Sequence, residues 1–327
     1  FALGLIGLGV QPKNAVAIFS ASRAEWVWAD VAIISAGAIS IPIYPSSTPE
    51  QAAYILNDSE SVAVIAENAA QAEKLQAMRD QLKTLKHIIV MEDKDKKGKG
   101  VLSMTEVREA GRKGDLKEIE RRIAAIKPDD LATIVYTSGT TGVPKGVMQS
   151  HENHLSMARM LATIGDFKEG DSNLLFLPLA HSFARSEEYA GIHLGYETWF
   201  AENIDKVGEN LMESHPTIFA SVPRVYEKVY GKVLAGAAAS AAKKKIFDWA
   251  VSVGTEVSRR IQKKEPIPLS LGLQKKLAHK LVFSKLHEKL GGRIRFCISG
   301  GAPLSREIAE FFHAAGILVI EGYGLTE

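Results

Sequence analysis

Residues 131–146 have the sequence LATIVYTSGTTGVPKG, in which an apolar, β-branched run leads directly into a loop of glycines and hydroxyl residues. The run predicts a buried strand over Leu131–Thr137. Open α/β sheets bind their ligands outside the carboxyl ends of their strands, and the loop starts at such an end. This segment therefore predicts an α/β fold with a ligand-binding loop at one edge of a sheet.

The loop carries the groups that phosphate binding needs. Gly139 and Gly142 let backbone N–H groups approach phosphate oxygens, and Lys145 supplies a positive charge near the outer phosphates. The hydroxyls that can donate to phosphate or bind Mg²⁺ are those of Thr137, Ser138, Thr140 and Thr141. A Walker loop is excluded, because Pro144 precedes the lysine and Gly146 follows it where Ser or Thr would be required. A polar turn between two strands is the alternative to a phosphate site.

Strand and helix patterns alternate along most of the chain. Two segments have the spacing of capping boxes that open helices, Ser22 with Glu25 and Thr48 with Gln51, and a further helix is expected at about 69–84. Other strands are expected at Ala15–Ser20, Val62–Ala66, His87–Met91, Asn173–Leu177, Glu197–Ala201, Thr217–Ser221, Arg293–Ser299 and Leu318–Glu321. The alternation predicts an α/β fold of stacked, mostly parallel sheets with helices on both faces.

Composition limits the classes of protein. The 327 residues, 46% hydrophobic and 24% charged, suit about two folding units of ordinary globular composition. A shift at Lys127-Pro128 predicts a first α/β subdomain over 1–127 and a second over 128–327. The formal net charge of +2 argues against a nucleic-acid partner. The single cysteine, Cys297, excludes an internal disulfide, is expected to be buried in a strand, and fits a reducing, cytoplasmic compartment.

The stretch between Arg224 and Ser299 predicts almost only helix. It contains the basic cluster Lys243–Lys245, which is expected to be a solvated helix face. Contact of this cluster with an anionic membrane or with coenzyme A phosphates is the alternative. The two ends predict a fragment, because Phe1 lies inside an expected helix and Glu327 directly follows a loop.

A second glycine-bearing segment, SGGAPLS at residues 299–305, follows an expected strand and precedes an expected helix. The paired Gly300 and Gly301 permit close approach of the backbone to a ligand, and Ser305 is expected to cap the helix. On these grounds alone, the segment is either a tight strand-to-helix turn or part of a ligand site.

The chain ends with a third such segment, EGYGLTE. Gly322 and Gly324 expose Tyr323, whose ring is suited to stacking on a purine. Thr326 can donate to an α-phosphate, and Glu327 is a hard oxygen ligand for Mg²⁺. The segment thus offers a platform for a base and ligands for a metal.

Residues 136–146 resemble the signature loop of the adenylate-forming superfamily, which includes acyl-CoA synthetases, luciferases and peptide-synthetase adenylation domains. The resemblance implies an ATP site contacted by Thr137, Ser138, Gly139, Thr140, Thr141, Gly142, Lys145, Gly300, Gly301, Ala302, Pro303, Gly322, Tyr323, Gly324 and Thr326. It also implies that Tyr323 contacts adenine and that Thr140 and Glu327 lie at the metal.

The segment LPLAHSF is another point of resemblance, because the superfamily has a histidine after such a leucine–proline pair, near the acyl carboxylate. His181 is therefore expected beside the carboxylate, and with Lys145 and Thr326 it makes up the expected catalytic set. A satisfied structural histidine is the alternative. His151 and His154 are expected to be capping or surface residues at the head of a helix.

The segments SVPRVYEKV (221–229) and AENID (201–205), with the long helical stretch, resemble the long-chain acyl-CoA synthetase branch. That resemblance implies part of a large N-terminal domain without the small C-terminal domain. It also implies a reaction in which a fatty acid and ATP give acyl-AMP, and coenzyme A then displaces AMP. A catalytic lysine and a ribose-binding aspartate would lie beyond Glu327, so the chain alone is expected to be inactive.

Other functions stay open. A fatty acyl-AMP ligase that serves a carrier protein would have the same loops, and a coenzyme A dependence assay would separate the two. A non-catalytic nucleotide-binding module is a second alternative, testable with Mg-ATP. A dinucleotide-binding enzyme is excluded, since no Gly-x-Gly-x-x-Gly follows the first strand. Acyl-chain length, oligomeric state and peripheral membrane contact are not decided by the sequence.

Overall fold

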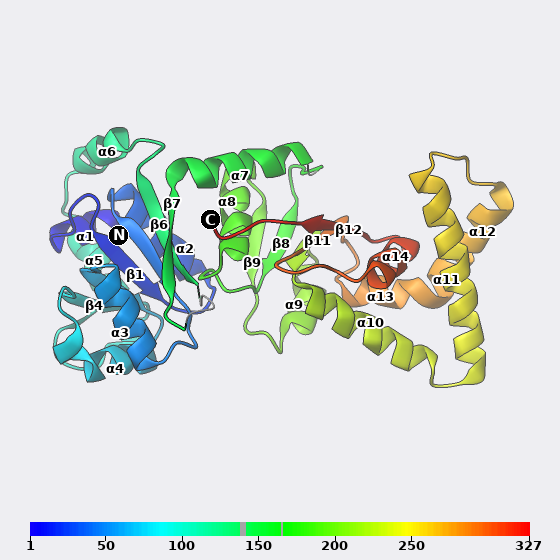
Figure 1. Cartoon of the computed structure of the whole chain (residues 1–327), viewed down its shortest axis with the longest axis horizontal. Coiled ribbons are helices and arrows are strands. Elements are labelled where there is room, and N and C mark those ends of the chain that lie inside the picture. Colours follow the sequence, from blue (N-terminus) through cyan, green and yellow to red (C-terminus); the bar gives the residue numbers. More distant parts are fainter. Residues whose placement is uncertain (138–141, 165) are drawn as a thin grey trace. The chain divides into compact units, whose positions relative to one another are not determined.

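The computed structural model describes residues 1–137, 142–164 and 166–327, which form two compact units (Figure 1). The first unit comprises Phe1–Asp166, Leu177–Leu194 and Thr326–Glu327, and the second comprises Phe167–Phe176 and Gly195–Leu325. Each unit thus combines segments that are distant in the sequence. The subdomain boundary expected at residues 127–128 stays a prediction.

The first unit contains a seven-stranded sheet in the order β5-β4-β3-β1-β2-β6-β7. Its strands are β1 (Ala15–Phe19), β2 (Ile39–Ile43), β3 (Ala63–Ala66), β4 (His87–Val90), β5 (Val101–Ser103), β6 (Leu131–Thr137) and β7 (Lys145–Ser150). The pairs are parallel apart from β6 with β7, which is antiparallel. Every residue of β1 and β3 is buried, as expected for parallel strands that are covered on both faces.

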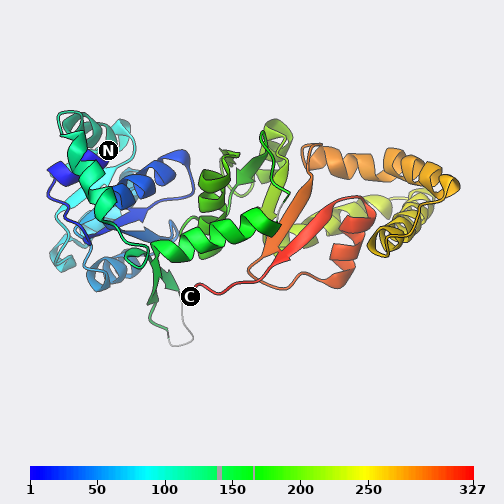
Figure 2. The same ribbon diagram turned by 90° about the horizontal axis from the view of Figure 1, so that it is seen from above.

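Helices pack on both faces of this sheet (Figures 1 and 2). The helices of this unit are α1 (Ala2–Gly7), α2 (Ala24–Ser35), α3 (Pro49–Asp58), α4 (Ala69–Ala77), α5 (Met104–Gly111), α6 (Leu116–Ala125), α7 (His151–Ile164) and α8 (Ser182–Leu194), with short 3-10 helices η1 (Arg79–Gln81) and η2 (Asp93–Asp95). The predicted α/β architecture is confirmed. The helix expected over 69–84 is shorter, because α4 ends at Ala77 and a 3-10 turn follows.

One of the two predicted capping boxes is confirmed and one is wrong. Thr48 and Gln51 form the reciprocal bonds that open α3. Ser22 does not cap α2, whose N-cap is Arg23 and has no side-chain cap bond. Instead, the Ser22 hydroxyl donates to the carbonyl of Leu177 at 2.7 Å and accepts from the backbone N–H of Leu179 at 2.8 Å. The Ser22 hydroxyl therefore forms long-range hydrogen bonds in place of the helix-capping bond that the local pattern predicts.

The second unit contains a five-stranded parallel sheet in the order β12-β11-β10-β8-β9. The strands are β8 (Ser172–Leu175), β9 (Glu197–Phe200), β10 (Ile218–Ser221), β11 (Phe296–Gly300) and β12 (Leu318–Gly322). Cys297 lies in β11 with no exposed surface, and burial raises the pKa of its thiol to about 12. The expectation of a cysteine buried in a strand is confirmed.

The stretch after β10 is helical, as predicted. It contains α10 (Pro223–Ala237), α11 (Ala241–Gln262), α12 (Leu269–Ala278), the π-helix η3 (His279–Phe283) and α13 (Ser284–Lys289), while α9 (Val207–Ser214) and α14 (Arg306–Ala314) lie outside it. Figures 1 and 2 show α11 and α12 side by side, away from the strands of this unit. Lys243–Lys245 are exposed on α11, which confirms the solvated face. Within the described ranges, no helix has both the length and the apolar composition needed to cross a bilayer.

Candidate functional site

The phosphate loop predicted from the sequence joins β6 to β7. The two strands form an antiparallel pair in which Thr137 lies opposite Lys145, so these residues flank the loop on its two sides. Four predicted phosphate ligands, Ser138, Gly139, Thr140 and Thr141, lie outside the described residues, and their roles stay predictions. The described part of the motif therefore consists of the two strand ends, at Thr137 and Lys145, from which the loop of this β-hairpin leaves the sheet.

Two glycines shape this hairpin for different reasons. Gly142 has φ +84°, in the left-handed region that other residues rarely adopt. At Gly146, an added Cβ would lie 2.7 Å from a methyl carbon of Ile134 and 3.2 Å from the ring of Tyr136. The Tyr136 hydroxyl donates to Asp58 at 2.7 Å, which holds the ring in this place. Side-chain packing from β6 thus excludes any larger residue after the motif lysine.

The Lys145 side chain is available to a ligand. It is exposed at the start of β7, and no carboxylate of the described residues lies within ion-pair distance of it. A lysine ammonium without a protein counter-ion is suited to bind phosphate as a point charge. Lys145 is therefore available to the nucleotide phosphates expected from the sequence, and its role there stays a prediction.

His181 lies at the head of α8, in the first unit. Its Nδ1 accepts a hydrogen bond from the backbone N–H of Phe183 at 3.1 Å. Nδ1 therefore carries no proton in this arrangement, and the neutral ring has its proton on Nε2. The side chain is exposed at the surface, yet the protein atoms around it desolvate the ring and lower its pKa. A neutral imidazole that offers Nε2–H, beside the N–H groups of a helix start, suits a carboxylate ligand.

Thr326 is brought to the same unit from the far end of the sequence. The Gln149 side-chain amide on β7 donates to its backbone oxygen, and the Ser182 hydroxyl on α8 donates to its side-chain oxygen at 3.5 Å. The strand that follows the phosphate loop, the helix that follows His181 and the end of the chain therefore meet around this threonine. The sequence analysis did not single out either of its two partners.

The metal ligands expected from the sequence are only partly described. Glu327 is exposed and has no ion-pair partner among the described residues, so its carboxylate is available to a cation. Thr140 lies outside the described residues, and no group of three or more His, Cys, Asp or Glu side chains in the described part is arranged to hold a metal. A Mg²⁺ ion at Thr140 and Glu327 stays a prediction.

In the second unit, the other two glycine segments leave neighbouring strands at the same edge. Gly300 and Gly322 are paired in the register of β11 and β12, so residues 301–303 and Tyr323 both follow carboxyl ends of adjacent parallel strands. Gly301 has φ +81°, and the Glu321 carboxylate accepts from the backbone N–H of Leu304 at 3.0 Å, which ties the two segments together.

The ring of Tyr323 is 91% exposed, as a platform for a planar base requires. Ala302 and Pro303 are exposed in the loop after β11, and Gly324 follows Tyr323 in the sequence. Ser305 occupies the N-cap position of α14, but its side chain makes no cap hydrogen bond, so that detail of the prediction is wrong. The convergence of these residues with the hairpin of the first unit stays a prediction.

A buried charged network holds α8, and the sequence analysis missed it. Arg185 and Asp30 of α2 are both fully buried and form an ion pair with Nη1 and Oδ1 2.7 Å apart. The Tyr189 hydroxyl donates to Asp30 at 2.9 Å and accepts from Arg185 at 2.8 Å, and the guanidinium lies 4.9 Å from the ring of Trp26. Burial alone would lower the pKa of Arg185, but the negative charge of Asp30 raises it. The available signal in the sequence was the opposite charges of Arg185 and Glu188, which are three residues apart and therefore neighbours on one helix face.

Two more titratable side chains border this network. Burial and the charge of Asp30 raise the pKa of Glu188 well above its usual range, and neither of its oxygens accepts a hydrogen bond from a described residue. The ring of His154 packs 4.5 Å from the ring of Tyr189, and burial lowers the pKa of His154 to about 3. His154 is therefore an interior-facing neutral ring, and its prediction as a capping or surface residue is wrong. The residue that makes a local hydrogen bond at the start of α7 is Asn153 instead. Its side-chain oxygen accepts from the backbone N–H of Ser150 at 2.8 Å.

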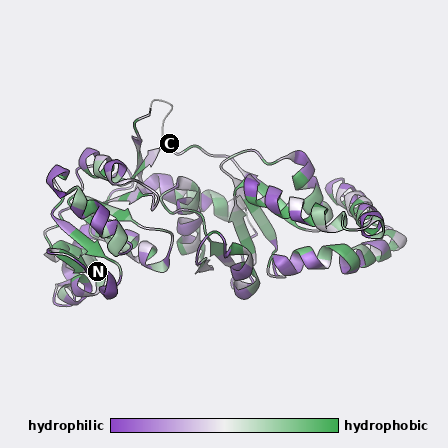
Figure 3. Ribbon diagram, turned by 90° about the horizontal axis from the view of Figure 1, so that it is seen from below, coloured by the Kyte–Doolittle hydropathy of each residue, from purple (hydrophilic) through white to green (hydrophobic). Residues whose placement is uncertain are grey.

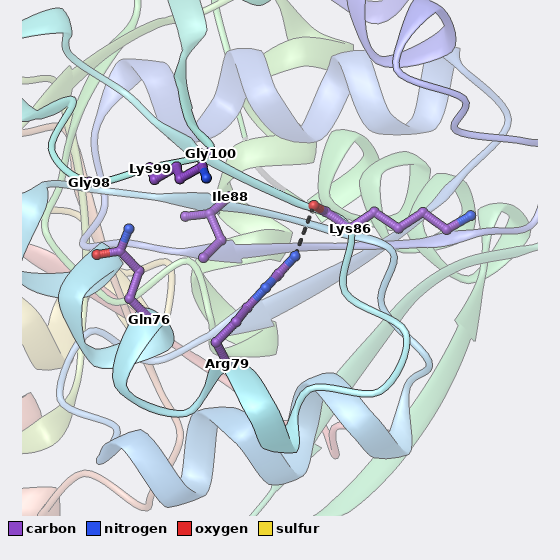
Figure 4. Close-up of a pocket in the computed structure, with 7 residues that line it drawn as sticks. All are labelled: Gln76, Arg79, Lys86, Ile88, Gly98, Lys99 and Gly100. Atoms are coloured by element: carbon purple, nitrogen blue, oxygen red, sulfur yellow. Dashed lines mark hydrogen bonds between the residues drawn. The ribbon is translucent and has the colours of Figure 1, made fainter.

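A pocket of about 410 Å³ lies elsewhere in the first unit (Figure 4). It is lined by Gln76, Arg79, Lys86, Ile88, Gly98, Lys99 and Gly100. In Figure 4 the Lys86 side chain extends away from the pocket, and its backbone oxygen accepts from Arg79 at 3.2 Å. None of the site residues predicted from the sequence lines this pocket, so it is separate from the candidate site.

Comparison with known proteins gives sequence relatives over the full chain. A long-chain-fatty-acid–CoA ligase, FadD15 of Mycobacterium bovis, is 37% identical over 328 residues, which is 100% of this chain and 54% of that protein. The long-chain-fatty-acid–CoA ligase ACSBG2 of Homo sapiens is 35% identical over 337 residues, 100% of this chain and 50% of that protein. The chain therefore spans about half the length of the curated relatives it matches.

Solved structures share the fold at lower sequence identity. The adenylation domain of a carboxylate reductase from Mycobacterium chelonae has a TM-score of 0.76 and 20% identity, covering 100% of this chain and 49% of that one. A fatty acyl CoA synthetase of Mycobacterium tuberculosis has a TM-score of 0.67 and 22% identity, covering 100% and 53%. The family described as AMP-binding enzyme matches residues 1–327. This chain belongs to the AMP-binding enzyme family.

Proposed function

We propose that this chain forms the nucleotide-binding part of a long-chain-fatty-acid–CoA ligase that uses ATP and releases AMP. The observation that supports it most is the β6–β7 hairpin, which presents Lys145 without a carboxylate partner in the described ranges, beside the predicted phosphate loop. Family membership and the long-chain ligases among the relatives support the same reaction. The substrates are a fatty acid, ATP and coenzyme A.

In the first half-reaction, a carboxylate oxygen of the fatty acid attacks the α-phosphorus of ATP, and pyrophosphate leaves. Lys145 would stabilise the charge that develops on the departing pyrophosphate. His181 would hold the attacking carboxylate through Nε2–H, while Thr326 donates to the α-phosphate and the Tyr323 ring stacks on adenine. Mg²⁺, when held by Thr140 and Glu327, would neutralise part of the phosphate charge.

In the second half-reaction, the thiol of coenzyme A attacks the acyl carbon and AMP leaves. No protein nucleophile is needed, because AMP is already a good leaving group. Cys297 is unsuited to act as one, since it is buried in β11 with a raised pKa. A fatty acyl-AMP ligase that transfers to a carrier protein shares the first half-reaction and stays the alternative.

The test is ATP–pyrophosphate exchange by the full-length protein across a panel of acids of increasing chain length. We expect exchange that depends on Mg²⁺ and is fastest with long-chain acids, and acyl-CoA formation when coenzyme A is added. Exchange without thioester formation would support the acyl-AMP ligase instead. If the protein binds Mg-ATP but shows no exchange with any acid, it is a non-catalytic nucleotide-binding module, and the proposal is contradicted.

A further inference from the structure

Gln149 is the one buried residue of β7, a strand at the edge of the seven-stranded sheet. It is 7% exposed, and its side-chain nitrogen donates to the backbone oxygen of Thr326. Its side-chain oxygen is also buried and accepts no hydrogen bond from a described residue. A buried acceptor without a donor destabilises a fold, so stability alone does not account for a glutamine at this position. The contact with Thr326 is what its amide provides.

Gln149 and Lys145 lie on the same face of β7. The register of β7 with β6 is unbroken from Lys145 to Gln149, so side chains alternate and residues 145, 147 and 149 share one face. Four residues of an antiparallel strand span about 13 Å. Figures 1 and 3 both show the C-terminal end of the chain beside this hairpin. The hydrogen bond from Gln149 therefore holds Thr326 along the strand face that begins with the phosphate-loop lysine.

The start of α8 contacts the same threonine. The Ser182 hydroxyl donates to Oγ1 of Thr326 at 3.5 Å, so the Thr326 hydroxyl accepts from the protein and keeps its own proton for another acceptor. Thr326 is half-buried, whereas every other residue of 321–327 is exposed. The end of the described chain is thus held at Thr326, through its backbone oxygen by Gln149 and through its hydroxyl by Ser182.

We propose that Gln149 and Ser182 are positioning residues that hold Thr326 for the α-phosphate of ATP. Gln149 fixes the backbone of Thr326 on the β7 face that carries Lys145, and Ser182 leaves the threonine O–H free to donate to the phosphate. The inference rests on the proposed function and adds two residues that touch neither nucleotide nor acid in that reaction. Because Ser182 directly follows His181, it also links the group at the phosphate to the group at the attacking carboxylate.

The test is ATP–pyrophosphate exchange by full-length variants with palmitate, resolved into kcat and KM for ATP. Gln149→Leu removes the donor and keeps a side chain of similar size. We expect kcat to fall about 10–100-fold with KM for ATP almost unchanged, because a misplaced group costs the transition state more than it costs ground-state binding. The matched control is Met148→Leu, the adjacent residue on the other face of β7, which is 70% exposed and should exchange as the wild type does.

Variants of Ser182 separate positioning from folding, because they change a half-buried residue by a single hydroxyl. Ser182→Ala should lower kcat about tenfold, and Ser182→Thr, which keeps the hydroxyl, should restore most of that loss. In a Thr326→Val background, Ser182→Ala should cause almost no further loss, since the hydroxyl through which it acts is already gone. Circular dichroism and thermal unfolding check that each variant is folded, and the Ser182 series decides the question if Gln149→Leu does not fold.

Three results would overturn this inference while the proposed function stands. They are wild-type exchange by both Gln149→Leu and Ser182→Ala, a raised KM for ATP with kcat unchanged, and an equal loss from Ser182→Ala with and without Thr326→Val. Absence of exchange by the wild-type protein with every acid would instead contradict the proposed function, and this inference with it. Exchange by the wild type together with the losses given above would support both.

Discussion

Helices α8 and α14 are held in their units mainly by different kinds of contact. In the first unit, α8 is fixed by the buried ion pair of Arg185 with Asp30 and by hydrogen bonds with Tyr189. In the second unit, α14 is held mainly by apolar packing: Phe312 packs against Tyr226 with ring centroids 5.6 Å apart, and Phe311 packs against Phe247 at 6.1 Å. Side-chain hydrogen bonds from Tyr230 to Glu307 and between Ser258 and His313 add to this packing. Directional bonds permit one placement of a helix, whereas apolar packing tolerates small shifts. The helix with the buried ion pair is the one that starts beside His181.

This contrast gives the buried charges a role. A buried ion pair is weak evidence for stability, because desolvation of the two charges offsets most of their attraction. We therefore interpret the Arg185–Asp30 pair as a device that fixes the position of the α8 head. Arg185 acts through that placement and is a positioning residue, since it touches neither substrate nor nucleotide in the proposed reaction.

The largest expected change in stability comes from breaking the buried ion pair between Arg185 and Asp30. Asp30→Ala leaves the fully buried guanidinium of Arg185 without its counter-ion, so we expect the free energy of unfolding to fall by about 3–5 kcal/mol. Denaturant unfolding measures it. Asp30→Leu with Arg185→Leu removes both charges and should recover most of that loss. If the double variant is as unstable as the single one, the burial of an unpaired charge is not the cause.

The next effect is a pH dependence of stability that comes from His154 in the first unit. The pKa of His154 is about 3 in the folded chain and about 6.5 when unfolded. Its contribution to stability is therefore complete above about pH 6.5 and is lost as the pH falls toward 3, because the unfolded chain binds the proton first. At pH 5 the loss is about 2 kcal/mol.

The measurement is the change in the free energy of unfolding between pH 7 and pH 5. His154→Gln should flatten this change by the same amount, and His193→Gln, at an exposed position on α8, is the matched control. An unchanged slope in the His154 variant would show that the ring is solvated in the folded protein.

The smallest expected changes in the free energy of unfolding come from removing one helix N-cap side chain in each unit. Thr48→Ala removes a formed capping box on α3 and should lower the free energy of unfolding by about 1 kcal/mol. Ser305→Ala removes a side chain that makes no cap bond on α14, so we expect a change of only a few tenths of a kcal/mol. Equal losses from the two variants would mean that Ser305 does cap its helix in solution.

These caps also show how far local sequence reasoning reaches. Thr48 behaves as its pattern predicts, because both partners of the box are three residues apart. Ser22 has the same local pattern, but its hydroxyl bonds to Leu177 and Leu179, more than 150 positions away, and no local rule contains that contact. The strands that were predicted lie within a few residues of the observed ones, since apolar runs and turn residues are local signals. The short strands β2 and β5 were not predicted.

The residues of the candidate site also fall into those that the sequence could predict and those that it could not. The glycine segments and Lys145 could be found from the sequence, because their residue types match phosphate chemistry at fixed spacing. The meeting of Gln149, Ser182 and Thr326 could not, since it joins three distant parts of the chain. The inward orientation of His154 was also hidden, because it depends on the packing of α7 against α8.

The central claim is that Lys145 serves the phosphates of ATP in an adenylate-forming reaction. The most direct measurement is ATP–pyrophosphate exchange by full-length Lys145→Ala with palmitate, beside binding of the fatty acid to the same variant. Lys243→Ala, which removes an exposed lysine of α11, is the control and should exchange as the wild type does. We expect exchange to fall by a factor on the order of 10²–10³, with fatty acid binding almost unchanged, because the charge faces phosphate and not the acyl chain. Unchanged exchange together with lost fatty acid binding would contradict the account.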